Sequence, residues 1–241
     1  MKELGVFFSC FREVEAVKYS IKIIREIYPH IPIYLISDGG ADFSFLEKEY
    51  SRVYTSLEAD TMSDTFKITD QNFKEDRHQK AIKNCALAIL NRLENSIAFL
   101  KTPYILMMDP DTLVRGKLHI PPDAKLLGSR INHNFPIEYR RILEKVPHAK
   151  VINSWGATPA LFEVESFLQA CKFLQNNMNI FDELCKFFYA IYAHDVLLPT
   201  IYALIGIEET FNPDIVECLR KPGWEKTSKP LVHQFRKYYS H

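Results

Sequence analysis

The sequence has no excess of charge of either sign, because 30 Lys and Arg residues balance 30 Asp and Glu residues. Partners made of nucleic acid usually require a basic excess, so this balance disfavours them. No apolar run approaches the ~18 residues of a membrane span, and the first residues, Met1-Lys2-Glu3, lack the profile of a signal peptide. We therefore expect no membrane span and a cytoplasmic location.

The sequence also has no C-x-x-C pair, no internal repeat and no low-complexity stretch. Its five cysteines are odd in number and scattered, which is typical of reduced thiols that fill a core. They are Cys10, Cys85, Cys171, Cys185 and Cys218.

The first hundred residues alternate short apolar runs with longer segments in which apolar residues recur every three to four positions. This alternation is typical of β-α-β units and a parallel sheet. Strands are predicted at residues 4–8, 31–36, 52–55 and 103–108, and helices at residues 13–28 and 76–100. A chain of this length suits one α/β domain better than two. We expect a single α/β domain over residues 1–241, with a mostly parallel central sheet flanked by helices.

The second half of the chain has a different sequence pattern, with shorter apolar runs and many aromatic residues. Strands are predicted at 126–129 and 156–162 with an irregular polar segment between them, and helices at 163–176, 181–192 and 196–204. Residues 61–72 are polar enough to predict a mobile loop.

Two carboxylates, Asp109 and Asp111, directly follow the fully apolar run that ends at Met108. On an extended chain, residues i and i+2 point to the same side. Pro110 restricts Asp109 to extended conformations, which predicts an extended segment that presents both carboxylates to one ligand. Two hard oxygen ligands suit Mg²⁺ or Mn²⁺. A structural turn is the alternative, because the chain has twelve Asp residues and Asp-Pro is common in turns.

With this D-x-D after its fourth predicted strand, the chain resembles the GT-A class of nucleotide-sugar-dependent glycosyltransferases. The resemblance implies a Rossmann-like fold with a nucleotide-binding half, residues 1–111, and an acceptor-binding half, residues 112–241. It implies that Asp109 and Asp111 hold a divalent cation against a diphosphate. Asp111 is the more direct ligand of the two.

The same resemblance implies a donor site at the ends of the first strands and at the start of the long helix. Two glycines after Asp38 permit a close backbone approach to a ligand. Turn or helix caps and a solvated helix face are equally good explanations of these positions. The implied donor contacts are Ser9, Phe11, Arg12, Asp38, Arg77 and Lys80.

On the acceptor side, Trp155 offers a flat apolar face to a sugar ring and Gly156 allows a close approach of the backbone. Asp195, in the run Ala-His-Asp at 193–195, matches the acidic residue that takes the acceptor proton in inverting members. Capping of a helix that begins near Val196 is the structural alternative for Asp195. His194 is expected to orient the acceptor, and His233 matches a third protein ligand of the metal from a C-terminal segment.

The expected function is therefore transfer of a sugar from a nucleoside diphosphate to a hydroxyl of a glycan or another acceptor, with Mn²⁺ or Mg²⁺ and with inversion. UDP is the expected nucleotide, and GDP is the alternative. One other function is that of a non-catalytic carbohydrate- or nucleotide-binding module. Another is that of a sugar-phosphate nucleotidyltransferase, which would usually carry a Gly-rich loop where residues 9–13 contain no glycine.

Overall fold

The computed structural model describes residues 3–58, 76–128, 133–152, 154–155, 159–188, 193–211 and 230–232. The strands are β1 (Leu4–Cys10), β2 (Ile33–Asp38), β3 (Val53–Glu58), β4 (Tyr104–Met108), β5 (Leu113–Val114), β6 (Leu126–Gly128), β7 (His133–Asn134), β8 (Ser154–Trp155), β9 (Ala160–Glu163), β10 (Thr210–Phe211) and β11 (Leu231–Val232). The helices are α1 (Val14–Ile27), α2 (Phe45–Glu49), α4 (Asp76–Leu100), α5 (Ile137–Glu144), α6 (Val164–Asn176), α7 (Met178–Cys185) and α8 (Ala193–Leu204).

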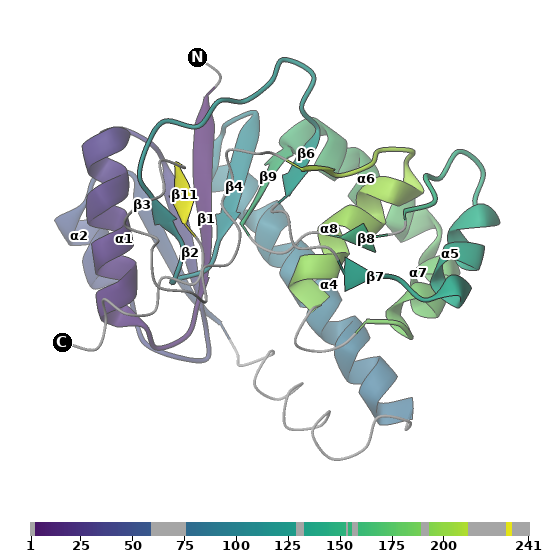
Figure 1. Ribbon diagram of the computed structural model, residues 1–241. Helices are drawn as coiled ribbons and strands as arrows, with labels where there is room; N and C mark the ends of the chain where they lie inside the picture. The colour runs from purple at the N-terminus through teal and green to yellow at the C-terminus, as the bar shows by residue number, and fades with distance from the viewer. Residues whose placement is uncertain are drawn as a thin grey trace.

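Seven strands form the central sheet in the order β10-β6-β9-β4-β1-β2-β3. All neighbouring pairs are parallel except those that β9 makes with β4 and β6. The prediction of a mostly parallel sheet flanked by helices is therefore confirmed (Figure 1). From β1 the chain moves outward through β2 to β3 and then returns to β4 on the other side of β1. This reversal makes the carboxyl ends of β1 and β4 a topological switch point, where ligands of open α/β sheets bind.

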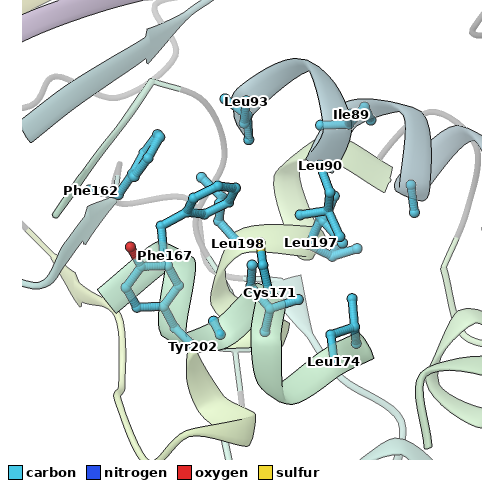
Figure 2. Packing of buried hydrophobic residues seen from close by; sticks show 14 of the residues in the cluster. Ile89, Leu90, Leu93, Phe162, Phe167, Cys171, Leu174, Leu197, Leu198 and Tyr202 are labelled. Carbon is cyan, nitrogen blue, oxygen red and sulfur yellow. The ribbon is translucent and has the colours of Figure 1, made fainter. Parts of the chain in front are cut away.

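Alternating residues of the strands supply two apolar layers on opposite faces of the sheet. In β4, Ile105 and Met107 join the layer under α4, α6, α7 and α8, whereas Leu106 and Met108 join the layer under α1. Figure 2 shows the first layer, where Leu93 of α4, Phe167 of α6 and Leu198 of α8 gather near Phe162 of β9. Both faces are covered, so β1, β2 and β4 are buried along almost their whole length.

A two-stranded ribbon made of β5 and β11 lies beside α1. Leu113 and Val232 pair with each other and pack against Tyr19 and Ile23 of α1. The other side of the ribbon, with Val114 and Leu231, packs in the layer under α1. The ribbon therefore joins two segments far apart in the chain to the same helix.

The first half agrees closely with the sequence-based prediction, and the second half agrees less well. The long helix at 76–100 and the four strands before the acidic pair are confirmed, whereas the short helix α2 was not predicted. The irregular segment predicted after residue 129 was wrong in part, because it contains α5, whose Tyr139 and Leu143 are fully buried. Helix α7 begins at Met178 and ends at Cys185, earlier than the predicted helix at 181–192.

Strand β9 begins at Ala160 rather than at residue 156. The loop predicted at 61–72 lies outside the described residues. None of the helices in the described part of the chain is long and apolar enough to cross a membrane.

Candidate functional site

The segment after β4 is a tight turn, which we call the acidic turn and define as residues Asp109 to Thr112. The backbone N–H of Thr112 donates to the carbonyl of Asp109 at 3.0 Å, which closes the turn. Pro110 occupies the second position, where the fixed φ of proline is favoured. The extended conformation predicted for this segment was therefore wrong, because the segment is a turn. That its carboxylates hold a metal stays a prediction. Asp109 and Asp111 are both half-buried.

Helix α1 contacts the acidic turn through a hydrogen bond from Ser20. The buried hydroxyl of Ser20 donates to the carbonyls of Pro110, at 3.3 Å, and Thr112, at 3.2 Å. The side chain of Thr112 is itself fully buried. The turn is thus part of the packed structure, and its two carboxylates sit on a fixed backbone.

The acidic turn lies at the switch point of the sheet, next to the end of β1. Phe8 pairs with Met108, the residue before Asp109, so Ser9 and Cys10 lie alongside the beginning of the turn. Burial raises the pKa of the Cys10 thiol well above its ordinary value, and the negative charges of Glu13 and Asp109 raise it further. This electrostatic coupling places Asp109 close to the end of β1. The structure therefore brings together Ser9, Asp109 and Asp111, three of the predicted donor-site residues.

In the loop after β1, backbone N–H groups bind the carboxylate of Glu13. The backbone N–H groups of Phe11 and Arg12 donate to one oxygen of Glu13, at 3.0 and 2.9 Å. The guanidinium carbon of Arg12 lies 4.6 Å from the centre of the Phe11 ring, in a cation–π contact. Phe11 is half-buried and Arg12 exposed at this edge of the sheet.

The two glycines after β2 serve the protein's own packing. Gly39 has a positive φ of 68°, and a Cβ atom at Gly40 would collide with the carbonyl of Phe11. Ala41 donates its N–H to the same carbonyl at 2.6 Å. The close backbone approach expected of these glycines is thus to the loop after β1.

Asp38, predicted as a donor contact, lies in a buried ionic cluster that sequence analysis missed. We call it the Arg92 cluster and define it as Arg92 of α4, Asp38 at the end of β2 and Glu58 at the end of β3. Arg92 donates to Asp38 at 2.5 Å and to Glu58 at 2.8 Å. Burial alone would lower the pKa of Arg92, but the two carboxylates outweigh burial and raise it.

A signal for Arg92 was present in the sequence. It lies three residues after Ile89 and four before Ser96, both on the buried side of α4. A basic residue on that face requires a buried acidic partner.

The start of α4, with Arg77 and Lys80, extends far from the Arg92 cluster. Lys80 precedes Arg92 by twelve positions, which corresponds to roughly 18 Å along a helix. Lys83, one turn after the exposed Lys80, pairs with Asp182 of α7. In the described residues nothing brings Lys80 to the acidic turn, and only the backbone of Arg77 is described. Their role as donor contacts stays a prediction.

The acceptor-side residues lie in the second half. Trp155 belongs to β8, which pairs with β7 and contacts α8, and only the backbones of Trp155 and His194 are described. Gly156 lies outside the described residues. The described part of α8 begins at Ala193, so Asp195 lies within its first turn, and the structural alternative, a cap of a helix that begins near Val196, was wrong. The role of Asp195 as the base stays a prediction. Asp195 is half-buried.

Carboxylate oxygens are the donors available for a metal at the acidic turn, and they fit Mn²⁺ or Mg²⁺. Within the described ranges, no group of three or more His, Cys, Asp or Glu side chains is arranged to hold a metal. His233 lies outside those ranges. The residue before it, Val232, pairs with Leu113, two positions after Asp111. The ribbon therefore brings Val232, the residue before His233, near the end of the acidic turn, and the role of His233 stays a prediction.

No protein-family model and no curated protein matches this chain. Among solved structures, one similar protein is the mannosyltransferase PcManGT from Pyrobaculum calidifontis, solved in complex with GDP-Man and Mn²⁺. The similarity covers 93% of this chain, with 12% sequence identity and a TM-score of 0.46. The chain spans 59% of the length of that structure. A likeness this distant does not decide what this chain does.

Proposed function

We propose that this chain is a metal-dependent glycosyltransferase. It moves a sugar from a nucleoside diphosphate, UDP by preference and GDP as the alternative, to a hydroxyl of a glycan or another acceptor. The observation that carries the proposal is the place of the acidic turn. Two half-buried carboxylates on a fixed backbone lie at the switch point of a mostly parallel sheet, where ligands of such sheets bind.

The metal would be held by Asp111, by Asp109 directly or through water, and by His233. When bound, Mn²⁺ or Mg²⁺ supplies positive charge that stabilises the departing diphosphate. The hydrogen-bonded backbone of the acidic turn would hold the Cα atoms of Asp109 and Asp111 at a constant spacing. The pairing of Val232 with Leu113 supports the assignment of His233.

The nucleotide would lie along the ends of β1 and β2. Ser9 and Phe11 follow the first strand beside the acidic turn, and Arg12 packs on Phe11 in a position to face an anionic ligand. Asp38, the proposed acidic contact of the nucleotide, is held in place by its ion pair with Arg92. Arg77 and Lys80 complete the proposed set of donor contacts.

Acceptor chemistry is assigned to the second half. Asp195 would accept the proton of the attacking hydroxyl from the side opposite the diphosphate, which gives inversion. Helix α8 contacts β8, and this supports a common role for Asp195, His194 and Trp155 on the acceptor side. Gly156 would allow the acceptor to approach the backbone.

A sugar-phosphate nucleotidyltransferase is less well supported. Such an enzyme would need free N–H groups in the loop after β1 to bind phosphates, and those of Phe11 and Arg12 are bonded to the Glu13 carboxylate. A non-catalytic binding module with the same fold is the second alternative. It would bind nucleotide or sugar without metal-dependent turnover.

The proposal is tested by calorimetric titration of UDP and GDP in the presence of Mn²⁺ and in the presence of EDTA. Wild-type protein should bind one of the two only with the cation, because like charges at the turn repel a diphosphate until a cation bridges them. Asp111→Asn should abolish this binding. Asp123→Asn, a substitution of the same kind at an exposed position in a loop, should leave it unchanged.

Two outcomes would count against the proposal. Equal affinity of wild-type protein and Asp111→Asn for the nucleotide would show that the acidic turn is not part of the nucleotide site. Binding that is insensitive to EDTA would favour the non-catalytic module.

A further inference from the structure

The hydrogen bonding of Ser20 differs from that of two other buried serine and threonine residues on the described helices, Ser96 and Thr200. The hydroxyl of Ser96 in α4 donates to Leu93 at 2.7 Å, and that of Thr200 in α8 donates to Val196 at 2.6 Å. These are the usual bonds of a helical hydroxyl to its own preceding turn. Ser20 instead directs its single hydroxyl proton out of α1, where two carbonyls of the acidic turn, about 90 positions later in the chain, share it.

The peptide groups before and after Asp111 are both hydrogen-bonded, the first to Ser20 and the second to Asp109. The carbonyl of Pro110 belongs to the peptide group before Asp111, and it accepts from Ser20. The peptide group after Asp111 supplies the N–H of Thr112, which bonds to Asp109. The next peptide group supplies the carbonyl of Thr112, which also accepts from Ser20. Because the peptide groups on both sides of Asp111 are hydrogen-bonded, its φ and ψ angles are restricted to one backbone conformation.

The neighbours of Ser20 on α1 fix the chain just beyond the turn. Tyr19 and Ile23 pack against Leu113 of β5 and Val232 of β11. Ser20 is 1% exposed, so water does not compete for its hydroxyl. One face of α1 thus holds the acidic turn by hydrogen bonds and the adjoining ribbon by apolar contact.

We infer that Ser20 is a positioning residue for metal binding. It touches no ligand, and it acts by holding the backbone of Asp111 in the conformation in which the carboxylate meets the cation. The inference rests on the proposed function for its effect on metal binding. Its effect on the turn itself is independent of that function.

The test compares substitutions at Ser20 with the same substitutions at Ser96, another buried helical serine that loses one hydrogen bond when replaced. Ser20→Ala removes the hydroxyl, and Ser20→Cys keeps a similar volume with a weak donor. The first measurement is amide hydrogen exchange at Thr112, by NMR, in the metal-free protein. We expect the Thr112 amide to exchange about fivefold faster in both Ser20 variants. The loss of one buried hydrogen bond changes the opening equilibrium by about this factor. Both Ser96 variants should match wild type at Thr112.

The second measurement is the Kd for Mn²⁺ alone, obtained from the EPR signal of the free ion. We expect a Kd about tenfold higher in the Ser20 variants, as for other groups that orient metal ligands without touching the metal. The Ser96 variants should stay within about twofold of wild type.

Thr112 exchange that is equal in Ser20 and Ser96 variants would overturn the inference, as would faster exchange with an unchanged Kd for Mn²⁺. Failure of the wild-type protein to bind Mn²⁺ is a different result. It would contradict the proposed function, and the claim that Ser20 fixes the turn would then be decided by Thr112 exchange alone.

Discussion

Two pairs of carboxylates lie at the carboxyl edge of the sheet, and the chain holds them in different ways. In the Arg92 cluster, a buried guanidinium bonds to Asp38 and Glu58 and joins the ends of β2 and β3 to α4. In the acidic turn, the backbone and the Ser20 hydroxyl fix the segment that carries Asp109 and Asp111. The charges of the first pair are balanced by Arg92 within the protein. The second pair remains half-buried at the switch point, the position at which open α/β sheets bind their ligands.

The largest effect that separates the two pairs concerns stability. Arg92→Leu should lower the free energy of unfolding by roughly 3–5 kcal/mol, because it leaves the Asp38 carboxylate buried without its cation. Asp111→Asn should change the same quantity by less than about 1 kcal/mol, because Asp111 is half-buried. Urea unfolding at pH 7 measures both.

A double variant, Asp38→Asn with Arg92→Leu, serves as the control for the Arg92 cluster. It should recover part of the loss, since the buried charge is removed together with its partner. Equal losses in Arg92→Leu and Asp111→Asn would erase the distinction between the two pairs.

A substitution at a third carboxylate, Asp195, tests whether donor binding and transfer depend on different residues. Asp195→Asn keeps the size of the side chain but removes the base, so transfer should fall by ~10²-fold or more. The affinity for the nucleotide should stay unchanged, because the proposed nucleotide contacts do not include Asp195. Rates of transfer and nucleotide Kd measured on the same preparation test this, and an unchanged rate would remove Asp195 from the mechanism. A product with retained anomeric configuration would exclude inversion.

A smaller effect is expected at His233, where the ribbon brings the chain to the acidic turn. His233→Ala should raise the Kd for Mn²⁺ about tenfold, as for loss of one ligand or an orienting group. Nucleotide affinity at saturating metal should change less. His241→Ala is the matched control, a histidine eight positions further along the chain. Equal effects of the two substitutions would show that the acidic turn binds metal without His233.

The smallest effect concerns the buried thiol of Cys185, which lies in the core, unlike the carboxylates at the edge of the sheet. It is expected in the pH dependence of the free energy of unfolding. Burial raises the pKa of Cys185 to about 12, and the charge of Asp182 adds to this. The folded state therefore binds the thiol proton more tightly than the unfolded state, so this stabilisation is complete below ~8.5 and is lost as pH rises toward 12. Between pH 9 and 10 the free energy of unfolding of Cys185→Ala should fall less steeply than that of wild type, by about 1.4 kcal/mol per pH unit. Parallel slopes would contradict this.

Sequence patterns predicted the first half of the fold because its elements are long and clearly bounded. Strand β4 is a fully apolar run that ends at an acidic pair, and α4, 25 residues long, carries apolar residues at helical spacing from Ala81 onward. The helices α2 and α5 were missed because they have only 5 and 8 residues and depend on tertiary packing. The division into a nucleotide-binding and an acceptor-binding half stays a prediction.

The candidate site could be located from sequence, but its conformation could not. Pro110 favours an extended Asp109, and it equally favours the second position of a turn. The bonds that decide between these come from Ser20 and from packing of the ribbon on α1. Neither leaves a local signal in the sequence. Arg92 could have been found, since it interrupts the apolar face of α4.

The pairing of β5 with β11 also sets an order of events during synthesis. Roughly 120 residues separate the two strands, so at ~5–20 residues per second the ribosome reaches β11 about 6 to 24 seconds after β5. During that interval the strands β1 to β4, with α1 and the acidic turn, are already available to fold. Among the described strands, only β11 pairs with β5, so the ribbon forms only after β11 emerges. The strands β1 to β4, with α1 and the acidic turn, can therefore fold before the ribbon is complete.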